Sequence, residues 1–151
     1  MAKPKIGIIC GSKSDLPVLA KAEAQLKDFG IAYDIAVASA HRTPKQVEQY
    51  AKNAEKKYDL IIAAAGMAAA LPGVVAAHTH LPVIGIPIHS VGLGGHDALF
   101  SIVQMPPGVP VATVAIDGGK NAAVLAAQIL SLKYSGLRAK LKNLKKELAG
   151  G

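Results

Sequence analysis

The stretch Ser39-Ala40-His41-Arg42-Thr43-Pro44 brings three kinds of reactive side chain together within four residues. Ser39 supplies a hydroxyl, and His41 supplies an imidazole, a group that exchanges protons near neutral pH. Arg42 supplies a planar guanidinium, which suits phosphate or carboxylate ligands. A histidine beside an arginine in a loop can also be a solvated pair, so the functional interpretation depends on the surrounding elements.

The residues on either side predict a strand-to-helix turn. Apolar residues 31–38 before the stretch are typical of a strand. After it, Thr43 as N-cap, Pro44 at the first helical position and Gln46 three residues past the cap predict a capping box. Open α/β sheets bind ligands at the carboxyl ends of their strands, which favours a functional role for this turn.

The rest of the chain alternates apolar runs with amphipathic segments. We expect further strands at 5–10, 59–65, 82–88 and 109–116, and helices at about 15–29, 44–57, 74–79, 97–104, 121–132 and 135–148. The runs are continuously apolar, which predicts a parallel sheet covered on both faces. We therefore predict an α/β protein: a three-layer flavodoxin-like fold with a parallel five-stranded sheet and an extra C-terminal helix, in one domain over residues 1–151.

Composition bounds the class of protein. Hydrophobic residues make up 51% of the 151 residues and aromatic residues 4%. The single cysteine, Cys10, excludes an internal disulfide and lies in a predicted buried strand, where we expect it to be inert. With no membrane-length apolar run and no signal-peptide pattern, we expect a soluble cytoplasmic protein without a membrane partner.

The net charge of +7 arises largely near the C-terminus. Leucines spaced four, three and four residues apart form one apolar stripe there, at Leu137, Leu141, Leu144 and Leu148. The basic residues between them indicate a solvated helix face rather than a nucleic-acid surface, because no aromatic platform accompanies them. We expect the helix at about 135–148 to pack on a neighbouring subunit.

Two more predicted strand ends carry polar or small residues. Gly11-Ser12-Lys13-Ser14-Asp15 offers hydroxyls and a helix start with Ser14 as N-cap, where a phosphate can bind, although a plain capped helix is the alternative. The Asp15 carboxylate could accept hydrogen bonds from ribose hydroxyls. The stretch 66–73 contains no titratable group, so its contribution is either room for a flat ligand or close helix packing.

The remaining histidines do not predict a metal site. His78 and His80 are two residues apart at a helix end, so they do not face one point, and no cysteine or glutamate cluster supports them. Ser90 and His96 are expected to reach the pocket from a glycine-rich loop, residues 89–96, which is a candidate lid.

Several blocks in one order resemble the PurE family of de novo purine biosynthesis over about residues 5–132. They are Gly11 to Asp15, Ser39 to Pro44, Leu71-Pro72-Gly73, Ser101 to Pro106, and Asn121-Ala122-Ala123 with Leu125-Ala126-Ala127. The resemblance implies a flavodoxin-like fold, a homo-octamer and no metal or organic cofactor. It also implies carboxyaminoimidazole ribonucleotide as substrate, in its N5 or C4 isomer, and small molecules rather than nucleic acid as partners.

The resemblance also implies site roles. His41 would be the acid/base group, and Ser12, Asp15, Ser39 and Arg42 would hold the ribose phosphate. Gly66, Ala68 and Ala69 would line the imidazole and carboxylate pocket, with Leu71 beside them. The full expected substrate-binding set is Ser12, Ser14, Asp15, Ser39, Ala40, Arg42, Gly66, Met67, Ala68, Ala69 and Leu71.

One turn departs from the bacterial mutase pattern Gly-Gly-Ala-Ala-His-Leu-Pro-Gly. Met67 replaces a glycine and Ala70 replaces the histidine, while the Arg-Ser-Asn pattern of the animal-type carboxylases is also absent. We expect an N5-carboxyaminoimidazole ribonucleotide mutase, with a carboxylase using free CO2 as the alternative. A nucleotide-sensing or receiver-like module is the non-enzymatic alternative, although the third strand ends in alanines rather than an acidic phosphoacceptor.

Overall fold

The computed structural model describes residues 2–151 and contains one five-stranded parallel sheet in the order β2-β1-β3-β4-β5. The predicted α/β class and strand number are therefore confirmed. The strands are β1 (Lys5–Cys10), β2 (Ala32–Val37), β3 (Leu60–Gly66), β4 (Val83–Ile88) and β5 (Ala112–Thr113). In this order the chain reverses direction across the sheet between β1 and β3, and their carboxyl ends leave a crevice there.

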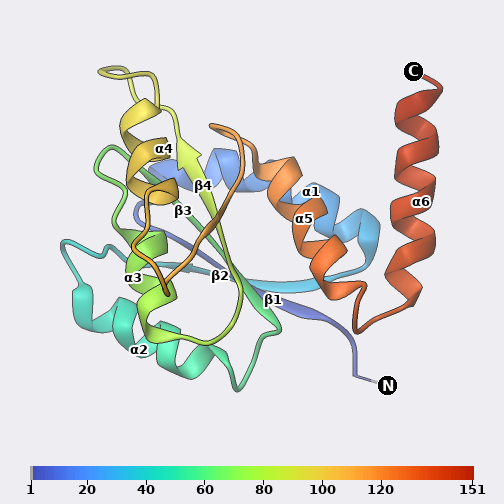
Figure 1. Cartoon of the computed structure of the whole chain (residues 1–151), viewed down its shortest axis with the longest axis horizontal. Coiled ribbons are helices and arrows are strands. Elements are labelled where there is room, and N and C mark those ends of the chain that lie inside the picture. Colours follow the sequence, from blue (N-terminus) through green and yellow to red (C-terminus); the bar gives the residue numbers. More distant parts are fainter. Residues whose placement is uncertain (1) are drawn as a thin grey trace.

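Helices cover both faces of the sheet, which makes three layers (Figure 1). The helices are α1 (Leu16–Phe29), α2 (Pro44–Ala54), α3 (Leu71–His78), α4 (His96–Val103), α5 (Gly119–Leu130) and α6 (Gly136–Ala149). Side chains on one face of β1, such as Ile8, pack with α1 and α5, while Ile9 on the other face packs with α2, α3 and α4. Alternate strand residues thus feed two separate cores, as expected for strands buried on both faces.

The first helix begins differently from the sequence-based expectation. A 3₁₀ turn over Lys13–Asp15 precedes α1, and its N-cap is Ser12 rather than Ser14. The Ser12 side chain accepts from the Ser14 amide, and the Asp15 carboxylate accepts from the Ser12 amide, which is a capping box. Gly30 ends α1 in the left-handed conformation, as predicted.

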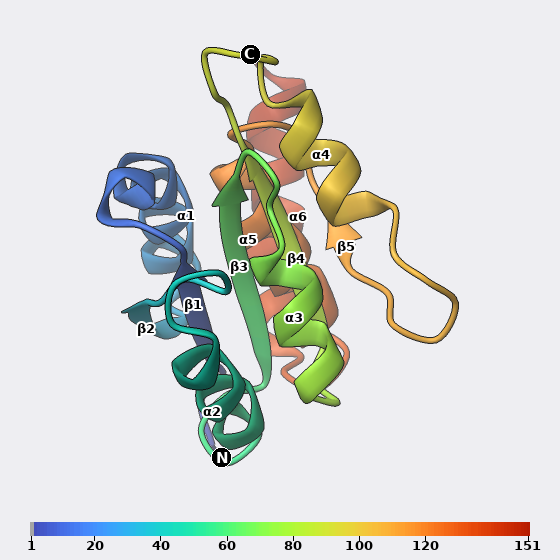
Figure 2. The same cartoon turned by 90° about the vertical axis from the view of Figure 1, so that its left-hand side faces the viewer.

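The fifth strand is much shorter than the predicted 109–116. Only Ala112 and Thr113 pair in register with β4. Pro110 has no amide hydrogen to donate, and beyond Thr113 the chain keeps only isolated hydrogen bonds to β4, such as that from the Val114 amide to the Gly85 carbonyl (3.2 Å). Figure 2 shows the connection between α4 and β5 standing out from the body as a loop.

The C-terminal helix α6 lies outside α5 (Figure 1). Leu137 is buried, and Leu141 and Leu144 pack against the α1–α5 core of the same chain, whereas Leu148 is 62% exposed. The Lys140 ammonium donates to the Phe29 carbonyl (2.8 Å), so a cation caps the carboxyl end of α1. Across residues 2–151, we find no helix with the length and apolar character needed to span a membrane.

Candidate active site

The turn after β1 is held by its own serine and aspartate side chains. The Asp15 carboxylate accepts from the Ser12 amide (3.0 Å), and the Ser14 hydroxyl donates to the Ser12 hydroxyl (2.9 Å). Partial burial raises the pKa of Asp15, while the backbone amides of Ser12 and Gly11 and the charge of Arg42 oppose that rise. The turn therefore presents two hydroxyls and a partly desolvated carboxyl group to the sheet edge.

The turn after β2 is closed by reciprocal bonds between Ser39 and Thr43. The Ser39 amide donates to the Thr43 hydroxyl (3.0 Å), and that hydroxyl donates to the Ser39 carbonyl (3.1 Å). Thr43 is the N-cap of α2 by position, but its side chain makes no capping bond, so the predicted capping box with Gln46 is wrong. The hydroxyl is already engaged across the turn that carries His41 and Arg42.

Arg42 joins this turn to the turn after β1. Its Nη2 donates to the Gly11 carbonyl (3.0 Å), and its amide donates to the Ser39 hydroxyl (3.2 Å). His41 is exposed at the tip of the turn. A proton-transfer group and a fixed cation therefore stand side by side at the crevice of the sheet.

The turn after β3 contributes shape rather than charge. Ala69 and Leu71 are each 2% exposed, while Met67 is 67% exposed. Met67 has φ of 56°, a left-handed conformation that favours glycine. The thioether that departs from the mutase pattern therefore stands at the surface of this turn.

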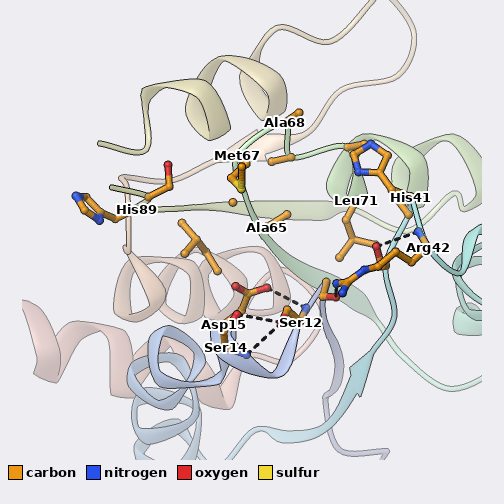
Figure 3. A pocket seen from close by; sticks show the side chains of 18 residues that line it. Ser12, Ser14, Asp15, His41, Arg42, Ala65, Met67, Ala68, Leu71 and His89 are labelled. Atoms are coloured by element: carbon orange, nitrogen blue, oxygen red, sulfur yellow. Dashed lines mark hydrogen bonds between the residues drawn. The ribbon is translucent and has the colours of Figure 1, made fainter. Parts of the chain in front are cut away.

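These turns share one cavity of about 600 Å³. Figure 3 shows its lining, with Asp15 and Ser12 below and His41 and His89 on opposite sides. The cavity is lined by the whole predicted catalytic and substrate-binding set: Ser12, Ser14, Asp15, Ser39, Ala40, His41, Arg42, Gly66, Met67, Ala68, Ala69 and Leu71. The predicted residues are brought together, and their roles toward a ligand stay predictions.

The end of a fourth strand, β4, also lines the cavity, and only one of its residues there was predicted from the sequence. Ile88, His89 and Ser90 line the cavity at the end of β4. Ser90 was expected there, but His96 does not line the cavity, and its Nδ1 lies 3.0 Å from the Leu93 carbonyl. The signal that could have found His89 is its position directly after the apolar run of β4.

Beneath the cavity, Cys10 ends β1 with no exposed surface. Its thiol donates to the Ser12 carbonyl (3.3 Å). Burial, with the nearby charge of Asp15, raises the pKa of Cys10 to about 11. Burial and the raised pKa both favour the protonated thiol, which is the less reactive form.

The other histidines lie apart from this cavity. The His80 amide donates to Glu55 Oε1 (2.7 Å), and His80 Nδ1 lies 3.1 Å from the same oxygen. Within residues 2–151, no three His, Cys, Asp or Glu side chains are grouped as metal ligands. The residues that line the cavity offer an imidazole, which can transfer protons, next to a guanidinium, which can bind an anion.

Known proteins are similar to this chain in sequence and in fold. The model of the AIR carboxylase family matches residues 5–150. The chain is 57% identical over 146 residues to the N5-carboxyaminoimidazole ribonucleotide mutase of Pyrococcus abyssi, covering 96% of this chain and 84% of that protein. It is 54% identical over 143 residues to the phosphoribosylaminoimidazole carboxylase of Saccharomyces cerevisiae, covering 94% of this chain and 25% of that protein.

Structure comparison agrees with the sequence. The crystal structure of Treponema denticola PurE superposes with a TM-score of 0.90 at 35% identity, covering 98% of this chain and 93% of that one. The family model, the curated relatives and the solved structure thus all indicate the same family. The chain belongs to the AIR carboxylase family.

Proposed function

We propose that this protein is an N5-carboxyaminoimidazole ribonucleotide mutase of purine biosynthesis, an isomerase that moves a carboxylate from N5 to C4 of the aminoimidazole. The observation that carries the proposal is the shared cavity, whose lining combines the His41 imidazole with hydroxyls, a carboxyl group and a guanidinium from neighbouring turns, and with the His89 imidazole on the opposite side. The mutase names of the archaeal and bacterial relatives support it.

In this mechanism the chain binds the ribonucleotide through its first two turns. Arg42 and Ser39 would hold the phosphate, and Asp15 with Ser12 would accept and donate hydrogen bonds at the ribose. The small residues after β3, Gly66 to Ala69, would leave room for the flat imidazole and its carboxylate. Positioning of this kind converts a two-molecule encounter into a reaction within one pocket.

His41 would carry the proton through both half-reactions. The N5 carbamate breaks its N–C bond, releasing CO2, and the nitrogen takes a proton from the His41 imidazolium. The C4 carbon then attacks the same CO2, and its own proton returns to His41. The proton count balances, so the only requirement is that CO2 stays in the pocket between the two steps.

The competing activity is direct carboxylation of aminoimidazole ribonucleotide by free CO2. Met67 and Ala70 depart from the mutase pattern, and the yeast relative is named a carboxylase. The test compares two reactions without ATP: synthetic N5-carboxyaminoimidazole ribonucleotide alone, and aminoimidazole ribonucleotide with bicarbonate. We expect rapid formation of the C4 isomer from the first alone. Faster product formation from the second mixture would overturn the mutase, and His41→Asn serves as the inactive control in both.

Binding without turnover would instead support the sensing module. We expect no such result, because a pure binding site needs no exposed imidazole beside its anion contact. Wild-type protein that binds the ribonucleotide yet leaves both substrates unchanged would contradict the enzyme.

We also propose a homo-octamer in the cytoplasm, where its phosphorylated substrate is expected, with residues 1–151 as one domain. Apolar side chains exposed on and before α4 support subunit contacts: Val91 (99%), Leu93 (64%), Phe100 (60%) and Val103 (46%). The exposed outer end of α6, at Leu148, is proposed to pack on a neighbour. Light scattering after gel filtration tests this, and a monomer at micromolar concentration would contradict it.

A further inference from the structure

Asp117 has a backbone conformation that is rare for its residue type. It lies between β5 and α5 with φ of 58°, and Met67 is the other non-glycine residue at positive φ among residues 2–151. Aspartate and asparagine tolerate this left-handed region better than other non-glycine residues. The conformation turns the chain out of the sheet, so the Asp117 carbonyl accepts from the Gly119 amide (2.9 Å) at the start of α5.

The side chain of Asp117 takes over the bond that its carbonyl gives up. In a parallel ladder, a residue donates its amide to one residue of the neighbouring strand and accepts, at its carbonyl, from the residue two positions further on. The Asp117 amide donates to the Pro87 carbonyl (2.8 Å), and Asp117 Oδ1 accepts from the His89 amide (2.9 Å). The Asp117 carboxylate thus accepts the hydrogen bond from the His89 amide that a strand carbonyl would accept if the sheet continued past β4.

This hydrogen bond lies directly after the last residue of β4, where His89 and Ser90 begin one wall of the cavity. β5 pairs with β4 only at Ile84 and Gly85, which is short of the residues that line the cavity. His89 and Ser90, on the side of the cavity opposite His41, follow the end of β4 (Figure 3). Other contacts also reach these two residues: the Ser90 carbonyl accepts from the Gly94 amide (2.9 Å), and Gly95 lies so close that an added Cβ would be 3.2 Å from the His89 Cα.

We propose that Asp117 is a positioning residue for the His89–Ser90 wall of the substrate pocket. It does not line the cavity, and it acts through the backbone of His89. Its effect on turnover rests on the proposed function, whereas its effect on the wall does not.

The test uses full-length protein and three variants. Asp117→Asn keeps both the tolerance for positive φ and an oxygen acceptor, so we expect KM and kcat within twofold of wild type. Asp117→Gly keeps the conformation and removes the acceptor; we expect KM to rise about tenfold with kcat changed less than threefold, because His41 and Arg42 stand on another turn. Lys120→Ala, an exposed neighbour, is the matched control.

Hydrogen–deuterium exchange of the His89 amide, measured without substrate, separates this proposal from the mutase assignment. We expect strong protection in wild type and Asp117→Asn, and at least tenfold faster exchange in Asp117→Gly. Unprotected His89 in wild type, or wild-type KM and protection in Asp117→Gly, would overturn the proposal, and the wild-type measurement decides even if the glycine variant does not fold. Loss of substrate affinity in Asp117→Asn would also overturn it, since charge rather than position would then be at work.

Discussion

Replacing Thr43 by valine removes a hydroxyl while preserving the size and branching of the side chain. The hydroxyl makes two bonds to Ser39, one accepted from its amide and one donated to its carbonyl. At about 0.5–1.5 kcal/mol for each bond, Thr43→Val should lower the free energy of unfolding by about 1–3 kcal/mol. For a chain of this length that corresponds to a fall in Tm of roughly 2–12 °C.

The same change should reduce turnover, because His41 and Arg42 lie between the two bonded residues. A misplacement of the order of 1 Å at a reacting group costs about a hundredfold in rate, so we expect kcat/KM to fall by about that factor. The assay is mutase turnover beside thermal unfolding, with Thr43→Ser as the control that keeps the hydroxyl. Exchange of the Ser39 amide should accelerate more than that of Gln46; the reverse order would mean that the hydroxyl caps α2 after all. A valine variant with wild-type Tm and kcat/KM would refute the reasoning.

Three further outcomes are expected. His41→Asn should fold normally, since the side chain is exposed, and lose about two to four orders of magnitude in kcat; near-normal kcat would remove His41 from the mechanism. Arg42→Ala should raise KM about 10- to 100-fold through the lost anion contact, and an unchanged KM would argue against that contact. Burial favours neutral Asp59, yet the bonds from Lys133, the Lys5 amide and Tyr134 lower its pKa overall. Ionised Asp59 then stabilises the fold above about pH 4 and stops doing so as acid protonates it, so acid should destabilise wild type more steeply than Asp59→Asn. Parallel pH profiles in urea unfolding would contradict this.

The sequence was sufficient to predict the sheet and the turns that meet at its edge. Apolar runs such as Lys5–Cys10 mark the buried strands, because a strand covered on both faces has no polar side to alternate with. Since the strands are parallel, their carboxyl ends fall on one edge, and the residues after β1, β2 and β3 line one cavity. The hydrophobic pattern predicts the strands and the turns after them because both follow from which segments are buried.

Details that depend on tertiary contacts were out of reach. The hydroxyl of Thr43 has a local partner at Ser39 that competes with the capping bond, and spacing cannot rank the two. Only Ala112 and Thr113 pair with β4, although β4 itself continues to Ile88, whereas hydrophobicity alone predicts a full strand over residues 109–116. The bond from His89 to Asp117 joins residues 28 positions apart, which no local pattern predicts.

The burial of Cys10 has a practical consequence for future experiments. It is the single thiol of the chain, it has no exposed surface, and its pKa is about 11. Maleimide reagents near neutral pH should therefore leave the native protein untouched. A cysteine introduced as Gly92→Cys, at an exposed position where an added Cβ meets no atom within 4 Å, would become the sole attachment point for a fluorophore. Because no other thiol would react, the fluorescence of the labelled protein would report on motion of the loop after β4 alone.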